Sequence, residues 1–267
     1  MTEYKKQDEI FRDWSESSAN YDRIIRDELN SFRPDAWLRQ ILSHFPEGKR
    51  LRILDIGCGP GFFSIILSMA GHEVTGIDGA DGMLERCRKN VEASGCGAKI
   101  LKGDAANLEF PDETFDLVVS RNVTHAIPDH VKAYTEWKRV LKPDGILLIY
   151  DANWHFEETV PAVREQYYKD WRECIRVYGS DFNENTDPDG IPQVDKDTLG
   201  THPLGDLMRP DYDIGILKAV GFESVSFVRD VTGPLWDDKE KLLYGTTPMF
   251  EIKAKASVKT FSENLYK

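Results

Sequence analysis

The sequence predicts a doubly wound α/β fold, in which helices cover both faces of a mostly parallel sheet. Short apolar segments alternate with longer amphipathic segments between Leu51 and Tyr150. A cluster of glycines directly follows the first apolar segment, as in a strand-turn-helix unit. Strands and helices that alternate in this way form parallel sheets through right-handed crossovers. The chain of 267 residues is long enough for one such domain with an insertion.

The predicted core consists of seven strands and the helices between them. In its regular part, strands are expected at 51–56, 74–77, 99–102, 115–120 and 145–150, and helices at 62–70, 83–94 and 129–141. The turn signal Lys142-Pro143-Asp144-Gly145 precedes the fifth of these strands. A helix at 212–219 and strands at 224–228 and 248–256 complete the sheet. We therefore assign residues 49–151 and 211–257 to the α/β core.

Two segments lie outside this alternation. Residues 1–48 carry apolar side chains at helical spacing, such as Ile10 and Trp14, and predict an N-terminal lid of two or three amphipathic helices. Residues 152–210 are rich in aromatic side chains and end in a loop of Asp, Asn, Gly and Pro. We interpret them as a helical, aromatic insertion on the substrate side of the core. The aromatic residues indicate either a small core of their own or a substrate cage.

The charge and the cysteines restrict the partners and the compartment. The formal net charge of −12 repels phosphate backbones and anionic lipid, so we expect no nucleic acid and no membrane as a partner. No apolar segment reaches the length of a membrane span, and the first ten residues lack the apolar centre of a signal peptide. The four cysteines show neither zinc-site spacing nor disulfide density. We expect a cytoplasmic protein with free thiols and no metal site.

The glycine cluster lies at the position where an open parallel sheet binds its ligand. The run Leu54 to Gly61 reads Leu-Asp-Ile-Gly-Cys-Gly-Pro-Gly, and its glycines let the backbone approach a ligand next to a helix N-terminus. Asp78 ends the second strand, at a separation that suits a carboxylate bound to ribose hydroxyls. A dinucleotide-binding turn would need glycine where Phe62 stands. The pattern therefore favours another adenosine-containing ligand.

The motifs between Tyr21 and Asp151 resemble those of the class I S-adenosylmethionine-dependent methyltransferases. The likeness is greater to the small-molecule group that includes the ubiquinone/menaquinone-type enzymes. Segments 54–61, 76–78, 103–105 and 115–122 resemble the first four motifs of the family in order. Asp144 stands where these enzymes commonly have glycine. The resemblance implies a Rossmann-like methyltransferase fold with S-adenosylmethionine as the cofactor and S-adenosylhomocysteine as the product.

The resemblance also implies roles for individual residues around the methionine part of the cofactor. Gly57, Gly59 and Gly61 would line this part. Ser120 or Arg121 would lie near the methionine carboxylate or the sulfonium.

Other residues would hold the adenosine part. Asp78 would bind the ribose hydroxyls, and Gly79 beside it belongs to the same expected site. Asp104 would accept a hydrogen bond from the adenine amino group, Ala105 would offer its backbone N–H to the ring, and Met83 would pack on the adenine face.

Each of these roles has a simpler structural alternative. Asp78 is also a suitable N-cap for the following helix, and Asp104 a suitable turn residue. A methionine such as Met83 often fills a core. Asp55 is expected in the cofactor site mainly because it would orient the glycine loop. Tyr21 resembles a tyrosine that closes over the cofactor from an N-terminal helix.

Two residues are candidates for acid-base chemistry. His125 follows the fourth strand and Asp151 ends the fifth, so both are expected near the mouth of the pocket. Either residue could take a proton from a hydroxyl or an amine, whereas a thiolate or an enolate-like carbon would need no base. His125 could equally pack in the interior. Asn153 and His155, just beyond Asp151, would contact substrate or cap the next segment.

The sequence thus predicts an enzyme that transfers a methyl group to a small-molecule acceptor by in-line displacement. We expect the lid and the insertion to exclude water from the pocket. A monomer or a homodimer is consistent with the sequence. Two alternatives are a nicotinamide-dependent oxidoreductase on a Rossmann sheet and a non-catalytic module that binds S-adenosylmethionine, because fold alone does not fix function.

Overall fold

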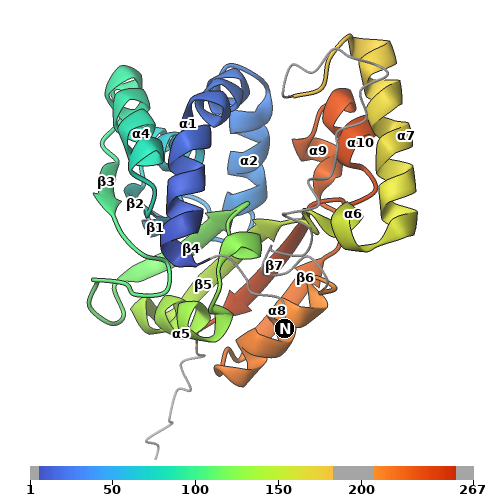
Figure 1. Ribbon diagram of the computed structural model, residues 1–267. Coiled ribbons are helices and arrows are strands. Elements are labelled where there is room, and N and C mark those ends of the chain that lie inside the picture. The colour runs from blue at the N-terminus through green and yellow to red at the C-terminus, as the bar shows by residue number, and fades with distance from the viewer. Residues whose placement is uncertain (1–5, 183–206, 257–267) are drawn as a thin grey trace, which may run out of the picture.

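A seven-stranded sheet forms the centre of the molecule (Figure 1). The computed structural model describes residues 6–182 and 207–256. The strand order is β3-β2-β1-β4-β5-β7-β6, and β7 runs antiparallel to both of its neighbours while the other pairs are parallel. The strands are β1 (Arg52–Ile56), β2 (Glu73–Asp78), β3 (Lys99–Lys102), β4 (Phe115–Arg121), β5 (Leu141–Asp151), β6 (Ser224–Val228) and β7 (Phe250–Lys255). The predicted mostly parallel sheet is confirmed.

Helices cover both faces of this sheet, as the sequence predicts. The two N-terminal helices are α1 (Gln7–Leu29) and α2 (Arg33–Leu42), and those within the alternating part are α3 (Phe62–Met69), α4 (Asp81–Ser94), the 3₁₀ turn η1 (Thr124–Ala126) and α5 (His130–Val140). The later helices are α6 (Phe156–Thr159), α7 (Pro161–Tyr178), α8 (Asp211–Ala219), α9 (Thr232–Leu235) and α10 (Asp238–Tyr244). In the part of the chain that is described, no helix is long and apolar enough to cross a membrane.

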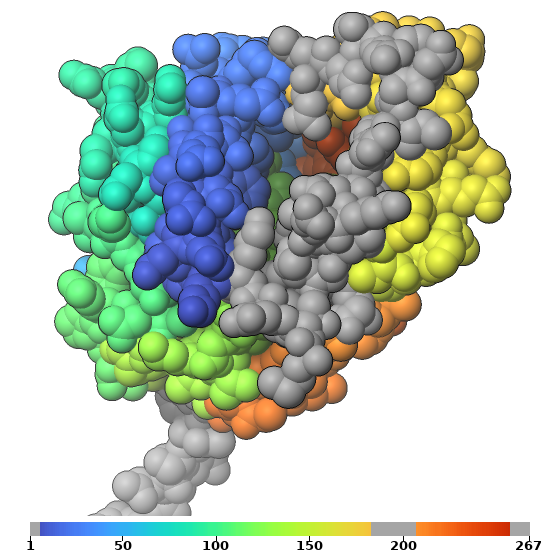
Figure 2. All heavy atoms as spheres, in the orientation of Figure 1, coloured from blue at the N-terminus to red at the C-terminus, as the bar shows by residue number. Residues whose placement is uncertain are grey.

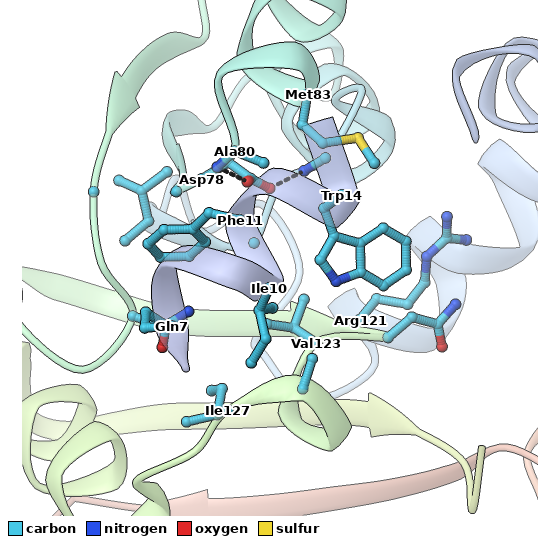
Figure 3. Close-up of a pocket in the computed structure, with 18 of the residues that line it drawn as sticks. Gln7, Ile10, Phe11, Trp14, Asp78, Ala80, Met83, Arg121, Val123 and Ile127 are labelled. Atoms are coloured by element: carbon cyan, nitrogen blue, oxygen red, sulfur yellow. Dashed lines mark hydrogen bonds between the residues drawn. The ribbon is translucent and has the colours of Figure 1, made fainter. Parts of the chain in front are cut away.

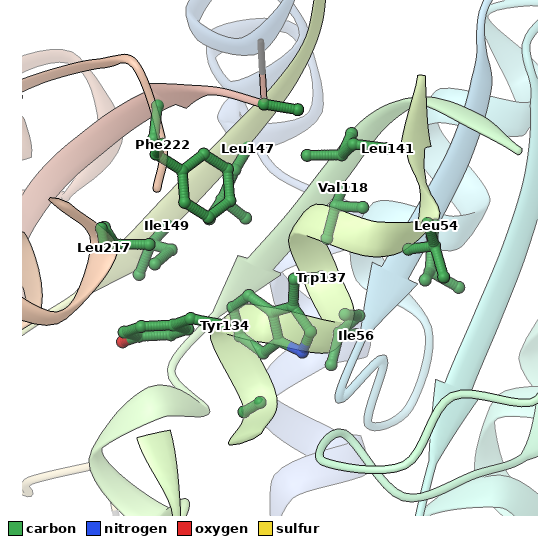
Figure 4. Packing of buried hydrophobic residues seen from close by; sticks show 14 of the residues in the cluster. Leu54, Ile56, Val118, Tyr134, Trp137, Leu141, Leu147, Ile149, Leu217 and Phe222 are labelled. Carbon is green, nitrogen blue, oxygen red and sulfur yellow. The ribbon is translucent and has the colours of Figure 1, made fainter. Parts of the chain in front are cut away.

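One face of the sheet packs against α5 and α8. Figure 4 shows Tyr134 and Trp137 of α5 and Leu217 of α8 against the aliphatic side chains of the central strands. Leu54 and Leu147 of this cluster are completely buried. Central parallel strands are buried on both faces, which explains why the sequences of β1 and β5 are nearly continuous apolar runs.

The opposite face packs against α2, α3 and the C-terminal half of α1. Trp37 of α2 lies at the centre of this second cluster, with its ring centroid 4.9 Å from that of Phe63 and 4.8 Å from that of Tyr150. Ile25 of α1 and Leu235 of α9 belong to the same cluster. The N-terminal helices are therefore part of the sandwich around the sheet as well as a cover at its edge.

The structure differs from the sequence prediction at β5 and between β6 and β7. The predicted turn at Asp144 lies inside β5, where Asp144 has a positive φ of 62° and the pairing with β4 shifts register between Phe115 and Leu117. The helices α9 and α10 lie between β6 and β7, where we predicted none. They are short, so their apolar periodicity is too brief to stand out from a loop.

The aromatic insertion divides into two environments. Trp171 and Cys174 of α7 are completely buried in a small core with Ile175 and with Leu243 of α10. Trp154 and Tyr167 line a cavity that faces α1 and α2, and Tyr167 also packs against the small core. The insertion therefore has a small core of its own, whereas the substrate cage stays a prediction. The part of the insertion at 183–206 lies outside the described residues.

Candidate active site

A cavity lies at the carboxyl ends of the parallel strands, where the strand order reverses between β1 and β4. Such a reversal is where open α/β sheets bind their ligands. We call it the first cavity. It is lined by Gln7, Ile10, Phe11, Trp14 and Tyr21 of α1 and by Gly57, Gly59, Ile77, Asp78, Gly79, Ala80, Met83, Gly103, Ala105, Arg121, Asn122, Val123, Ala126 and Ile127.

The loop between β1 and α3 forms one wall of the first cavity. Gly57 has a φ of 67°, and a Cβ at this position would lie 2.3 Å from the side chain of Val123. Gly61 has a φ of 103°, and its Cβ would lie 2.8 Å from the Sγ atom of Cys87. Glycine is required at both positions because other residues adopt neither this backbone conformation nor this close packing without strain. Gly61 faces α4 and does not line the cavity.

Asp78 holds the glycine loop at the end of β2 (Figure 3). Its Oδ2 atom accepts a hydrogen bond from the backbone N–H of Gly59 at 2.9 Å, and its Oδ1 atom accepts one from the N–H of Ala80 at 2.8 Å. Burial raises the pKa of the Asp78 carboxyl, although these backbone N–H groups partly offset the effect. A partly buried carboxylate that lines a cavity is suited to bind ligand hydroxyls.

Asp55 lies beneath the glycine loop. Its side chain is buried, its Oδ2 atom accepts a hydrogen bond from Ser64 Oγ at 2.7 Å, and it borders a small side cavity with Gly57 and Gly59. Burial raises the pKa of Asp55 to about 6, against the lowering effects of Ser64 and Arg121. Asp55 therefore connects the end of β1 to α3 beside the glycine loop.

The Asp55→Asn variant is expected to be more stable than the wild type at pH 7.5 but not at pH 4. The pKa is about 3.9 in the unfolded chain and about 6 in the fold, so the unfolding free energy falls as the pH rises between these values. Removing the charge should restore about 3 kcal/mol at pH 7.5. Urea unfolding at both pH values measures this difference. An equal gain at both would contradict the raised pKa.

Helix α1 closes the first cavity from above. A Cβ on Gly79 would lie 2.1 Å from the ring of Phe11, and one on Gly82 would lie 2.5 Å from the carbonyl oxygen of Ser15. The two glycines therefore let α1 pack directly against the loop after β2 and the start of α4. Figure 2 shows the side chains of α1 and α4 in contact on this face of the molecule. The lid role that we expect for the N-terminal segment stays a prediction.

Gly82→Ala is expected to separate α1 from α4. The added methyl group meets backbone, which cannot rotate away, and overpacking of this kind costs about 1–3 kcal/mol. Chemical denaturation should show this loss, and α1 should become more sensitive to proteolysis. Gly215→Ala in α8 is the matched control, because a Cβ there meets nothing within 4 Å and alanine favours helix. Equal stability of the two variants would disprove the close packing.

The structure places most of the predicted cofactor residues in one cavity. Those that line it are Tyr21, Gly57, Gly59, Asp78, Gly79, Met83, Ala105 and Arg121. The other four, Asp55, Gly61, Asp104 and Ser120, do not line the first cavity. Asp104 accepts a hydrogen bond from the N–H of Ala106 at 2.8 Å, and the buried Ser120 donates one to the carbonyl oxygen of Ile56 at 3.1 Å. These four residues shape the walls from behind or beside the cavity.

Of the residues that α1 contributes to the first cavity, sequence reasoning identified only Tyr21. Figure 3 shows Ile10, Phe11 and Trp14 directed toward the cavity from one face of this helix. Their helical spacing was visible in the sequence, but spacing alone does not show what the apolar face covers. Val123 and Ile127, which follow β4, were also missed.

A second cavity adjoins the first. The two share Tyr21, Arg121 and Asn122 as lining residues. Seven aromatic side chains line the second cavity, namely Tyr21, Trp37, Trp154, Tyr167, Phe182, Trp236 and Tyr244. The aromatic side chains come from α1, α2, the insertion and the segment between β6 and β7. The charged residues Glu28, Arg33, Arg121, Glu157 and Glu240 line it as well. The helices α9 and α10 therefore complete a chamber that the insertion alone does not form.

Arg121 lies at the junction of the two cavities. Its guanidinium donates to Glu28 Oε2 at 2.8 Å and lies over the ring of Phe62, 4.5 Å from the ring centroid. Burial would lower the pKa of Arg121, but the nearby Glu28 raises it. The cation is thus kept charged and fixed in place where the cavities meet.

His125 lines the second cavity and is held by Asp151. The imidazole Nδ1 atom lies 3.2 Å from Asp151 Oδ1, and the backbone N–H of His125 donates to Asp151 Oδ2 at 3.0 Å. Asp151 is completely buried and lines neither of the two cavities. Burial alone would raise its pKa, but the charge of Arg209, the His125 ring and the hydroxyl of Thr124 hold that pKa well below the usual value. Asp151 is therefore placed to orient His125 and not to contact a ligand.

The residues after Asp151 also separate into two roles. His155 lines the second cavity, with its ring centroid 6.3 Å from that of His125. Asn153 exchanges hydrogen bonds with the backbone of Arg209, donating at 3.2 Å and accepting at 3.0 Å, and does not line either cavity.

The sequence is similar to those of known methyltransferases. The profile of the family described as a methyltransferase domain matches residues 54–149. A demethylmenaquinone methyltransferase of Staphylococcus aureus strain MRSA252 is 31% identical over 180 residues, which cover 66% of this chain and 72% of the relative. The region that the family profile matches includes the glycine loop and Asp78.

Solved structures with the same fold include further proteins of this kind. A putative S-adenosyl-L-methionine-dependent methyltransferase from Methanococcus maripaludis superimposes with a TM-score of 0.59 at 21% identity, over 98% of this chain and 99% of that one. Phosphoethanolamine N-methyltransferase 2 of Haemonchus contortus, solved in complex with S-adenosyl-L-methionine, gives a TM-score of 0.56 at 19% identity, over 82% of this chain and 52% of that one. At these identities the likeness concerns the fold.

Proposed function

The chain belongs to the class I S-adenosylmethionine-dependent methyltransferases of the menaquinone-type group, and we propose that it methylates a small organic acceptor in the second cavity. The observation that carries this proposal is the junction of two cavities at Tyr21, Arg121 and Asn122. A methyl group has to pass between two bound molecules, so the two sites must meet. Family membership also decides against the nicotinamide-dependent oxidoreductase and the non-catalytic binding module.

The first cavity has the features that S-adenosylmethionine requires. The Asp78 carboxylate accepts the ribose hydroxyls, the apolar side chain of Met83 packs on the adenine, and Gly57 and Gly59 allow the methionine part to approach the backbone. Tyr21 closes the cavity from α1. When bound, the cofactor supplies a methyl group on a positively charged sulfur. The described residues supply position, dry surroundings and proton transfer.

The second cavity holds the acceptor in an aromatic enclosure. Trp37, Trp154 and Tyr244 provide flat apolar surface, while Arg121 and Asn122 present polar groups at the junction. The aromatic rings offer flat surface to the apolar part of an acceptor. The carboxylates of Glu28, Glu157 and Glu240 and the guanidinium of Arg33 line the same cavity and can bind the polar groups of the acceptor.

His125 is the base when the acceptor atom carries a proton. Since the Asp151 carboxylate only accepts hydrogen bonds, His125 donates from Nδ1, and the lone pair of its neutral ring is on Nε2. Nε2 makes no hydrogen bond to any of the residues described at 6–182 and 207–256. It takes the proton that the acceptor loses on methylation. Asp151 acts through His125, so the two predicted catalytic residues form one unit.

A thermal shift followed by methyl transfer tests this function. S-Adenosylhomocysteine should raise the melting temperature and NADH should not, because only the former fits the first cavity. The enzyme is then incubated with methyl-labelled S-adenosylmethionine and the low-molecular-weight fraction of a cell extract. Label should appear in a small molecule. Label confined to protein or nucleic acid would refute the small-molecule acceptor.

The remaining expectations stay predictions from the sequence. These are the cytoplasmic location, the monomer or homodimer, and the absence of nucleic acid and membrane among the partners. They depend on the net charge of −12 and on the cysteine pattern.

A further inference from the structure

A buried ion-pair network lies behind His125 and connects three distant parts of the chain. Asp151 at the end of β5 pairs with the Arg209 guanidinium, whose Nη1 atom lies 3.1 Å from Asp151 Oδ2. Arg209 also forms two hydrogen bonds to Asp213 of α8, at 2.8 and 2.9 Å. All three side chains are at least 98% buried. Buried charges are costly unless paired, so this network is sensitive to the loss of any member.

The network continues into η1, which carries His125. Thr124 Oγ1 donates to Asp151 Oδ2 at 2.6 Å and accepts a hydrogen bond from Arg209 Nη2. Thr124 thus bridges the cation and the anion, directly before His125 in the chain. Arg209 therefore contacts both groups that fix the imidazole: the carboxylate and the turn.

We propose that Arg209 is a positioning residue for His125, which it aligns and tunes through Asp151. This inference rests on the proposed role of His125 as the base. Asp151 carries one negative charge, and Arg209 and His125 both lie within contact distance of it. The positive charge of the guanidinium offsets part of the negative charge of Asp151, which would otherwise favour the protonated imidazole. Arg209 consequently favours the neutral imidazole, which is the form that can accept a proton.

Asp213 has a different task in this arrangement. It binds the opposite edge of the guanidinium and accepts a hydrogen bond from Tyr134 of α5 at 2.5 Å. The bidentate contact fixes the plane of Arg209, so that Nη1 remains directed at Asp151. Through Arg209, the position of α8 therefore affects the position of Asp151 in the active site.

Other charged and titratable groups also surround His125 and enter the interpretation of its titration. They are Asp151 of β5, Arg209 and Asp213 at α8, Tyr134 and His130 of α5, His155, Glu157 and Glu158 at α6, Arg121 of β4, and Glu28 and Tyr21 of α1. Of these, only Asp151 is hydrogen-bonded to the His125 side chain among the described residues. Arg209 is the cation in contact with that carboxylate. Among these groups, Arg209 is therefore the cation whose removal most directly changes the electrostatic potential at the His125 imidazole.

The test replaces Arg209 in two ways. Arg209→Met removes the cation that pairs with both Asp151 and Asp213, so it carries a risk of misfolding. The double variant Arg209→Met/Asp213→Asn removes one positive and one negative charge, which preserves the net charge of the network. The asparagine oxygen can still accept the Tyr134 hydrogen bond. The matched control is Arg229→Met, which breaks an exposed pair with Asp211 at 3.0 Å.

The principal readout is the titration of the His125 imidazole by nuclear magnetic resonance, assigned with the His125→Gln variant. Both Arg209 variants should raise its midpoint by about one pH unit, and Arg229→Met should leave it unchanged. The rate of methyl transfer into the extract fraction should be measured as a function of pH. The acidic limb of this profile should shift by the same amount. S-Adenosylhomocysteine affinity should stay as in the wild type, because Arg209 does not line the first cavity.

The outcomes separate this inference from the proposed function. An unchanged midpoint in the folded double variant would overturn the role of Arg209. A shifted midpoint together with full activity of His125→Gln would retain the coupling but overturn His125 as the base, and with it the assignment of Arg209 to catalysis. No methyl transfer by the wild type, with the midpoint shifted as expected, would count against the small-molecule methyltransferase alone.

Discussion

The His125→Ala variant should transfer methyl groups about 100- to 10,000-fold more slowly than the wild type, the range typical for loss of a general base. The imidazole is the titratable side chain that is bonded to Asp151 and also lines the second cavity. Its loss removes the acceptor of the proton without disturbing the first cavity. S-Adenosylhomocysteine affinity, measured by calorimetry, should therefore be unchanged.

The rate is measured with methyl-labelled S-adenosylmethionine and the extract fraction described above. His72→Ala is the matched control, since His72 accepts a hydrogen bond from the backbone of Leu51 at 3.3 Å and lines neither of the two cavities. Its rate should equal that of the wild type. A rate within a few-fold of the wild type for His125→Ala would mean that the acceptor needs no base, as a thiolate or a carbon nucleophile would.

The Asp78→Asn variant should bind S-adenosylhomocysteine about 100-fold more weakly, because charged hydrogen bonds are worth about 1.5–3 kcal/mol each. The amide lacks the negative charge and one acceptor oxygen, so it cannot hold both Gly59 and Ala80 and still bind the ribose hydroxyls. Calorimetry measures the affinity. Asp81→Asn is the control, because this exposed carboxylate pairs with Lys102 at 2.8 Å outside the cavity.

Binding should also depend on pH through Asp78. Burial raises the pKa of this carboxyl in the free protein, and the ribose hydroxyls need its ionised form. The affinity should therefore fall as the pH decreases through this raised pKa, and the Asp78→Asn variant should lose this dependence. A wild-type affinity that is constant from neutral pH down to pH 4 would contradict a role of the carboxylate in binding.

Much of the fold was predictable because its signals are local. The alternation of apolar strands with amphipathic helices between 51 and 151 specifies the parallel sheet, and the observed strands agree with it closely. The position of β7 between β5 and β6 was not predictable from the periodicity, since a strand that runs antiparallel at this place depends on tertiary pairing. The short helices α9 and α10 were missed because their apolar periodicity is too brief to stand out from a loop.

The candidate site was likewise predictable where it depends on local motifs, and unpredictable where it depends on tertiary packing. The glycine loop and Asp78 adjoin in space because they end neighbouring parallel strands, so their meeting follows from local motifs and topology. Phe11 reaches the cavity from a helix whose docking depends on Gly79 and Gly82, far away in the sequence. Arg209 meets Asp151 only in the folded state, and no motif marks it.

The antiparallel course of β7 brings its last residues to the edge of the sheet opposite the glycine loop. Ala256 donates its N–H to the carbonyl oxygen of Gly145 at 3.2 Å, near the start of β5. A fluorescent label or a surface linker attached to Lys255, the last residue of β7, would therefore lie away from both cavities, neither of which this residue lines. Immobilisation through this position should accordingly leave the enzyme accessible in surface-based assays.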